Sequence, residues 1–296
     1  MGATTDHALG RNLRYFTKKE TTAGGQYGTA SQEALAGANA AKVLGSTMEF
    51  TVARNDRMDA RTSRSVLERI TGKQEISWSC ESYLLPAGSS TAPDIDPLIE
   101  AAFGGSFGGS VAKTYNLASS NALPTCRIAR TANGVFREDL FGAYVEEFGL
   151  SLSGGEAPRM TFSGGAFNYA LTGTGTTHGS SSVTQTSLPL ATGDGVNFMV
   201  GSCIDVNTGS AIVTGKSAAD TLTVTTGNYG NSEAITPETY TETTAGSPLN
   251  GITGSLTLNS VSLPITSLDV TLTNGIKPLS DEAFEKGTSD IVAGFR

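Results

Sequence analysis

Residues 76–80 read Ile-Ser-Trp-Ser-Cys, and this stretch sets the fold class of the chain. Its apolar side chains at 76, 78 and 80 alternate with serines, which is the period of a β-strand with one buried and one solvated face. The same alternation recurs at residues 48–52, 148–152 and 268–272. Runs that alternate, rather than being apolar throughout, are typical of antiparallel sheets, so the chain is predicted to be mainly β.

Composition supports short strands joined by turns. The 296 residues include 36 Gly and 10 Pro, with only 16% charged residues, a balance that suits tight turns better than long helices. No run of about 18 apolar residues exists, so no membrane-spanning helix is expected. The first residues carry neither a basic nor an apolar region, and we therefore expect no secretory signal.

One short helix is predicted after a turn-rich connector. The stretch Asp94-Ile95-Asp96-Pro97 opens it, with Asp96 as the capping residue and Pro97 at the first helical position, where a missing N–H costs nothing. Gly104-Gly105 ends it.

A basic stretch, residues 54–73, separates two predicted strands. It carries six basic and three acidic side chains, a net charge of +3 inside a protein of net charge −8. Its length exceeds that of a hairpin turn, so it predicts a long protruding loop. Either the loop is exposed to solvent without a partner, or it binds an acidic surface of another subunit. The second interpretation assigns ring contacts to Arg54, Arg57, Asp59, Arg61, Arg64 and Arg69.

The sequence divides into three parts. Residues 1–46 show little periodicity and are interpreted as an N-terminal arm, either weakly ordered or docked on a neighbouring subunit through Leu13, Tyr15 and Phe16. Residues 47–172 and 249–296 form the β core. Residues 173–248 carry one basic and six acidic side chains, and they are predicted to be a small β domain inserted between two strands of the core, with its ends close together.

Two motifs resemble a catalytic or phosphate-binding site, but neither has the structural context or spacing that such a site requires. Residues 104–108 match a G-x-S-x-G elbow, but a helix rather than a strand precedes them. Residues 215–217 resemble the end of a phosphate-binding loop, but the glycine spacing is wrong. The chain has only two histidines, His7 and His178, and three scattered cysteines, which we interpret as reduced small hydrophobes. We therefore predict a protein that is not an enzyme, with no catalytic, metal-binding or cofactor-binding residue.

Several stretches resemble the tail tube proteins of siphophages, phages with long non-contractile tails. They are residues 10–21, residues 76–88 with 92–98, residues 274–279 and residues 290–296. The likeness covers roughly residues 10–172 and 237–296, and it rests on the order and spacing of the stretches. Members usually continue past the final Gly-Phe-Arg into a closing strand, whereas this sequence stops at Arg296.

The resemblance implies a β-sandwich or half-barrel whose sheets join across subunits. It implies hexameric rings stacked into a hollow tail tube, through which viral DNA passes without specific binding. It also implies contacts with a tape measure protein, a tail terminator and a distal tail protein, assembly in the host cytoplasm and a place in the virion. The acidic balance agrees, because it disfavours adhesion to DNA phosphates. The alternative class is another self-assembling β-rich virion protein, such as a decoration or surface-binding module.

Overall fold

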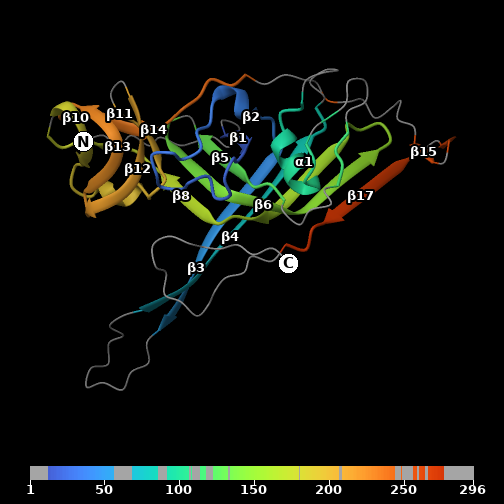
Figure 1. Ribbon diagram of the computed structural model, residues 1–296, viewed down its shortest axis with the longest axis horizontal. Helices are drawn as coiled ribbons and strands as arrows, with labels where there is room; N and C mark the ends of the chain where they lie inside the picture. The colour runs from blue at the N-terminus through green and yellow to red at the C-terminus, as the bar shows by residue number, and fades with distance from the viewer. Residues whose placement is uncertain are drawn as a thin grey trace.

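The computed structural model is mainly β-stranded, with antiparallel sheets and one α-helix among the residues it describes (Figure 1). These are residues 13–56, 69–85, 92–106, 108, 114–117, 123–132, 134–179, 181–206, 209–243, 248, 256–258, 260–263 and 266–276. The predicted fold class is confirmed, including one half-barrel sheet. Within these ranges no helix has both the length and the apolar character needed to cross a membrane.

Nine strands form the larger sheet, and β6 (Phe136–Ser153) belongs to both of its halves. The first part of β6 pairs with β5 and β8, and the second part pairs with β7 and β17. We call the halves sheet A and sheet B. Sheet A contains β2 (Ala40–Ala41), β1 (Leu13–Lys19), β5 (Cys126–Ala132), β6 and β8 (Asn168–Thr172). Sheet B contains β3 (Gly45–Asp56), β4 (Arg69–Tyr83), β7 (Arg159–Gly165), β6 and β17 (Ser267–Thr273).

A bend in β6 separates the two halves. Gly142 has a φ of 65°, in the left-handed region that favours glycine. An added Cβ at Gly142 would lie 2.3 Å from a ring carbon of Phe167. The Gly142 N–H donates to Glu20 Oε1 at 2.9 Å. The bend therefore needs a glycine, and a buried carboxylate holds it.

A β-bulge follows the bend, because β6 has one residue more than β7 between Val145 and Glu147. Neighbours on a regular strand point to opposite faces. The bulge interrupts that alternation at Glu146 and Glu147, and both side chains are exposed.

Helix α1 (Asp96–Phe103) packs against the apolar side of the sheets. Its N-cap is Ile95, not the expected Asp96, whose carboxylate accepts a hydrogen bond from the Tyr115 hydroxyl. Gly104 ends the helix with a φ of 78°, as predicted. Asn274 fastens α1 to β6, since its Nδ2 donates to the carbonyls of Ala102 at 3.0 Å and Val145 at 2.9 Å.

The main core lies between α1 and the sheets. Trp78 and Cys80 are buried in it while Ser77 is exposed, so the alternation that predicted this strand is confirmed. The Trp78 indole donates to the Gly165 carbonyl at 3.0 Å, which satisfies its buried N–H.

Strands β9 to β14 form a second, six-stranded sheet with its own hydrophobic cluster. They are β9 (Gly175–Thr176), β10 (Ser181–Pro189), β11 (Cys203–Val206), β12 (Gly209–Ala218), β13 (Thr221–Tyr229) and β14 (Ala234–Pro237). All lie within residues 173–248, which we call the inserted domain. The apolar alternation of Val196, Phe198 and Val200 does not form a strand. A 3-10 turn, η3 (Asp194–Asn197), leaves Val196 81% exposed, and Phe198 is buried.

Strand β1 corrects the interpretation of the N-terminal arm. It lies between β2 and β5, inside sheet A. Tyr15 belongs to the main core, and Phe16 packs on the opposite face with Leu35, Ala40 and Ala129. Because Tyr15 and Phe16 are buried within their own chain, they have no free apolar surface for a neighbouring subunit, and that role is withdrawn for them.

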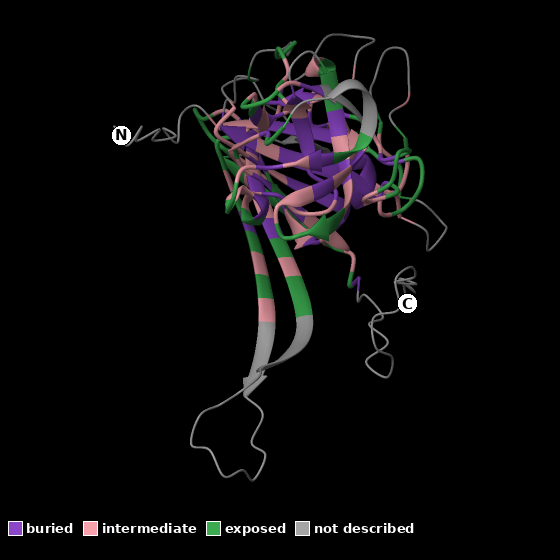
Figure 2. Cartoon of the chain, turned by 90° about the vertical axis from the view of Figure 1, so that its left-hand side faces the viewer, coloured by how far each residue is buried: buried purple, intermediate pink, exposed green. Residues whose placement is uncertain are grey.

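The loop expected at residues 54–73 is shorter than predicted. Strand β3 runs to Asp56 and β4 starts at Arg69, with Asp56 paired to Arg69. Strand β7 accompanies β4 only from Ser77 onward. The distal part of the β3–β4 hairpin is therefore a two-stranded ribbon that projects from the body of the molecule (Figure 1; Figure 2). It extends for about 20 Å, at roughly 3.3 Å per residue.

A short hairpin of β15 (Leu256–Leu258) and β16 (Val261–Leu263) precedes β17 and forms a separate two-stranded sheet. A 3-10 turn, η2 (Gly37–Asn39), precedes β2.

Candidate assembly surfaces

Sheet B has one face built of small polar and acidic residues. Directly paired residues in an antiparallel sheet point to the same side, so the register identifies this face. One row across it runs through Thr47, Ser79, Ser163, Glu147 and Thr273. The whole face comprises Gly45, Thr47, Glu49, Thr51, Glu75, Ser77, Ser79, Glu81, Tyr83, Arg159, Thr161, Ser163, Gly165, Tyr144, Glu147, Gly149, Ser151, Ser153, Ser267, Asp269, Thr271 and Thr273.

This face, which we call the polar face, carries a net negative charge. Five carboxylates stand on it against one guanidinium, that of Arg159. Arg159 Nη1 lies 3.1 Å from Glu81 Oε1 in an exposed ion pair. No aliphatic side chain lies on the polar face, whose two aromatic side chains are those of Tyr83 and Tyr144, and its single guanidinium makes no basic patch.

The two outermost strands of sheet B have open edges. Within the described part of the chain, β3 pairs only with β4, and β17 pairs only with β6. The unpaired side of such a strand presents backbone N–H and C=O groups to another chain. On β17, Val270 is 42% exposed although its register places it on the apolar side of the sheet. These features make β3 and β17 candidate contacts between copies.

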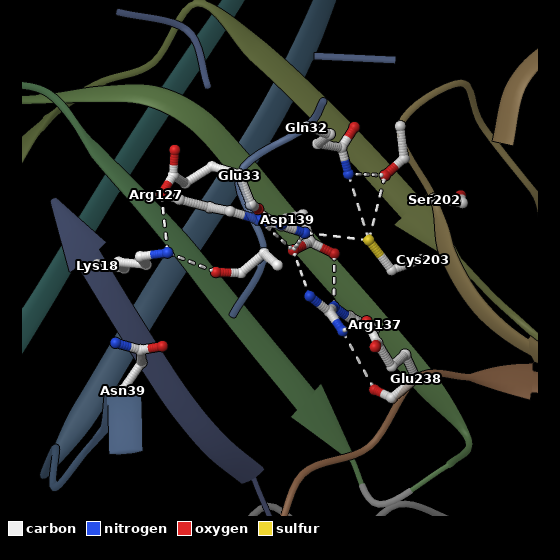
Figure 3. A network of polar contacts seen from close by, with 12 residues as sticks. Lys18, Gln32, Glu33, Asn39, Arg127, Arg137, Asp139, Ser202, Cys203 and Glu238 are labelled. Atoms are coloured by element: carbon white, nitrogen blue, oxygen red, sulfur yellow. Dashed lines mark hydrogen bonds and ion pairs between the residues drawn. The ribbon is translucent and has the colours of Figure 1, made fainter. Parts of the chain in front are cut away.

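A buried charged cluster, the Arg–Asp–Arg cluster, lies where sheet A meets the inserted domain (Figure 3). Asp139 on β6 is fully buried between Arg127 on β5 and Arg137 on β6, each only 1% exposed. Asp139 Oδ1 lies 2.8 Å from Arg127 Nη2, and Oδ2 lies 2.7 Å from Arg137 Nε. Burial alone would raise the pKa of Asp139, but the guanidiniums of Arg137 and Arg127 outweigh it and leave that pKa below its usual range.

Other donors of the cluster reach the inserted domain, while Arg127 Nη1 donates to the Glu33 carbonyl. Arg127 Nη2 donates to Cys203 Sγ at 3.1 Å. Arg137 Nη1 donates to the Glu238 carbonyl at 3.2 Å and lies 3.4 Å from Glu238 Oε2. Two positive and two negative side chains thus meet, one of the acids coming from the end of the inserted domain. Cys203 Sγ accepts hydrogen bonds, and burial raises the pKa of its thiol, as it does for Cys80 and Cys126 in the main core.

Residues 20–33 form a connecting loop between the core and the inserted domain. The Tyr27 ring packs edge-on against Phe141, with centroids 5.1 Å apart. Gln32 Nε2 donates to the Gly201 carbonyl at 3.0 Å and to Cys203 Sγ at 3.2 Å. A segment expected to reach outward therefore joins two parts of its own chain.

Of the residues predicted for ring contacts, Arg54 and Arg69 lie in the backbone ladder of the β3–β4 hairpin. Arg57, Asp59, Arg61 and Arg64 lie outside the described residues. Leu13 is half-buried on β1. The polar face and the Arg–Asp–Arg cluster were not predicted, although the spacing of Arg137 and Asp139 on one strand places both on one face.

The described residues contain no group of His, Cys, Asp and Glu suited to hold a metal ion. Residues 215–217 lie within β12, and Lys216 Nζ donates to the Gly195 carbonyl at 2.6 Å. The G-x-S-x-G match begins at the C-cap of α1.

No protein-family model and no curated protein matches the chain. Among solved structures, it is similar to a PVC sheath–tube complex of an extracellular contractile injection system in the extended state, at 6% identity and a TM-score of 0.31, over 54% of this chain and 88% of that one. It is also similar to an Hcp protein, at 11% identity and a TM-score of 0.26, over 54% of this chain and 91% of that one.

Proposed function

We propose that this chain is the subunit of a hollow tube, built from hexameric rings that stack on one another. The tube is the tail tube of a siphophage, and viral DNA leaves the capsid through its lumen. The resemblance of residues 76–88 and the other quoted stretches to that family supports the proposal. The protein then acts as structure, without a catalytic, metal-binding or cofactor-binding residue.

The observation that carries this proposal is the construction of sheet B. One face is apolar and lies against the core, the other is polar and acidic, and both edge strands are open. Open edges are a hazard for a lone subunit, but pairing β3 of one copy with β17 of the next removes them. Rotation that closes on itself gives a ring rather than an indefinite sheet.

In such a ring the polar face lines the channel. Its excess of carboxylates repels DNA phosphates, so DNA passes without sticking. Serine, threonine and glycine make up most of the remaining lining. These residues have no long side chains that would narrow the lumen.

Stacking of rings is assigned to the β3–β4 hairpin. Its distal ribbon projects away from sheet B, and the basic segment 57–68 joins its two strands. We place the acidic partner surface on the adjacent ring, where head-to-tail contacts extend into a filament. A tape measure protein, a tail terminator and a distal tail protein are the partners proposed for the tube's lumen and ends, with assembly in the host cytoplasm before incorporation into the virion.

Electron microscopy of the purified chain tests the proposal. The wild-type chain is expected to form rings and hollow tubes as its concentration rises. Val270→Lys is expected to remain an unassembled folded subunit, because it places a charge at the open edge of β17. Val196→Lys makes the same change at another exposed valine, in the inserted domain, and is expected to assemble normally.

A wild-type chain that stays monomeric at high concentration and binds glycans would favour the decoration or surface-binding class instead. If Val270→Lys forms normal tubes, β17 does not lie in the contact between subunits.

A further inference from the structure

The outer edge of β8, one of the two edges of sheet A, is covered by the inserted domain. Phe198 forms a β-bridge with Thr172, the last residue of β8. The Leu171 carbonyl accepts hydrogen bonds from Met199 N at 3.2 Å and from Ser202 Oγ at 2.9 Å. The Gly173 N–H donates to the Asn197 carbonyl at 2.8 Å. Residues 197–202 therefore occupy the positions that a further strand would take.

An outward carbonyl near the start of β8 also has a contact. The carbonyl of Tyr169 lies 3.5 Å from the Tyr27 hydroxyl, which comes from the connecting loop. The carbonyls of Tyr169 and Leu171 and the N–H of Gly173 are thus engaged within the chain, so this edge does not present a continuous row of free backbone groups to another copy.

Beside the opposite edge of sheet A, the segment that leaves the inserted domain contacts the turn η2, which precedes β2. Strand β2 is only two residues long. The Thr243 N–H donates to the Gly37 carbonyl at 3.2 Å, just before β2. A Cβ on Gly37 would lie 1.9 Å from the Thr241 carbonyl oxygen, so the two backbones are in close contact. The Tyr240 ring packs edge-on against Phe16, 5.4 Å away.

The Arg–Asp–Arg cluster holds this arrangement in place. Arg137 pairs in register with Thr172, where the chain enters the inserted domain, and its guanidinium binds Glu238, where the chain leaves it. Arg127 reaches Cys203 on β11. Both entry and exit are therefore anchored on one buried charged group in sheet A.

We propose that the inserted domain is an edge cap: it covers the β8 edge of sheet A, packs beside the β2 edge, and so restricts pairing between copies to β3 and β17 of sheet B. The identity of the pairing strands rests on the proposed function, whereas the contacts at β8 and at the turn before β2 do not. Natural sheets cover edges in this way to prevent unwanted association. A subunit with four open edges would have several ways to join, and only one of them closes a ring.

Site-resolved hydrogen exchange on the full chain, before and after assembly, tests the cap. In the unassembled chain the Gly173 and Met199 amides are expected to exchange at least about 100-fold more slowly than unprotected amides. Assembly is expected to change them less than about twofold, while outward amides of β3 and β17 slow by more than about tenfold.

Ser202→Ala removes the hydroxyl that contacts both Leu171 and Met199, and it should speed exchange at Met199 by about tenfold. Ser210→Ala, a matched change at an exposed serine of the same domain, should leave exchange at Met199 unchanged.

Fast exchange at Gly173 and Met199 in the lone chain overturns the cap, as does a large gain of protection in β8 on assembly. If the chain never assembles but these two amides are protected, the proposed tube function is wrong and the edge-cap proposal still holds.

Discussion

The buried Asp139 carboxylate pairs with the guanidiniums of Arg127 and Arg137, whose side chains are each only 1% exposed. Replacing it by Asn keeps the shape but leaves Arg127 and Arg137 without their shared counter-charge. We expect Asp139→Asn to lower the free energy of unfolding by about 3–5 kcal/mol. Urea unfolding of the unassembled chain measures this. Asp269→Asn, at an exposed carboxylate, should change it by less than about 0.5 kcal/mol.

The same residue predicts a pH dependence. The folded-state pKa of Asp139 lies below the unfolded value, because Arg137 and Arg127 outweigh the effect of burial. Its contribution to stability is therefore complete above the unfolded pKa, about 3.9, and is lost as the pH falls through the folded pKa. The difference in unfolding free energy between wild type and Asp139→Asn should stay constant from neutral pH to about 5 and shrink below about 4. A difference that already shrinks between pH 8 and 6 would contradict this assignment.

At the scale of elements, the bend in β6 decides whether one strand can serve two sheets. Gly142→Ala adds a Cβ at positive φ and against Phe167. We expect a loss of at least about 1–2 kcal/mol in the free energy of unfolding. Gly209→Ala is the control, since Gly209 on β12 has open space around its Cβ position. If both substitutions lower the free energy of unfolding equally, as measured in urea, then a side chain at position 142 does not strain the bend.

The basic segment at the end of the β3–β4 hairpin gives a second prediction at this scale. Arg57→Glu is expected to shorten tubes while rings still form, because it reverses a charge proposed to meet an acidic surface of the next ring. Arg57→Lys keeps the charge and should give tubes of normal length. Length distributions from electron micrographs, recorded at low and high salt, measure the effect. If Arg57→Glu forms tubes of wild-type length, the basic segment does not contribute to ring stacking.

Strands with one wet face could be predicted from sequence, and those covered on both faces could not. Trp78 and Cys80 alternate with serines because one side of β4 is solvated. Strand β1 has consecutive buried residues, Tyr15, Phe16 and Thr17, because clusters cover both its faces, so no alternation remains. The far end of the hairpin could not be predicted for the opposite reason: residues 53–56 and 69–73 lie beyond the pairing with β7, and their sequence shows no apolar alternation.

The candidate surfaces were harder to predict than the strands. Charged side chains on a strand normally indicate solvent, yet Arg127, Arg137 and Asp139 are buried because the inserted domain covers them. That contact joins residues far apart in the sequence. The polar face depends on the register of five strands, which alternation alone does not fix.

At the scale of the whole molecule, the proposed function depends on which way sheet B faces in the assembly. Glu49→Lys, Glu147→Lys and Asp269→Lys together would change the net charge of the polar face from −4 to +2. If that face lines the channel, tubes of this triple variant should retain duplex DNA, and the affinity should fall steeply with salt. Wild-type tubes should show no retention. Sedimentation of tubes with labelled DNA at two salt concentrations measures both.

A matched triple variant separates the lining from overall charge. Glu156→Lys, Asp205→Lys and Glu242→Lys give the same change in net charge at exposed or half-exposed positions off the polar face. Its tubes should bind DNA on their outside only, so nuclease should remove that DNA completely. DNA held by the first variant should resist nuclease, because the tube wall excludes the enzyme. Equal nuclease sensitivity in both variants would place the polar face on the outside of the tube and overturn the orientation that the proposed function requires.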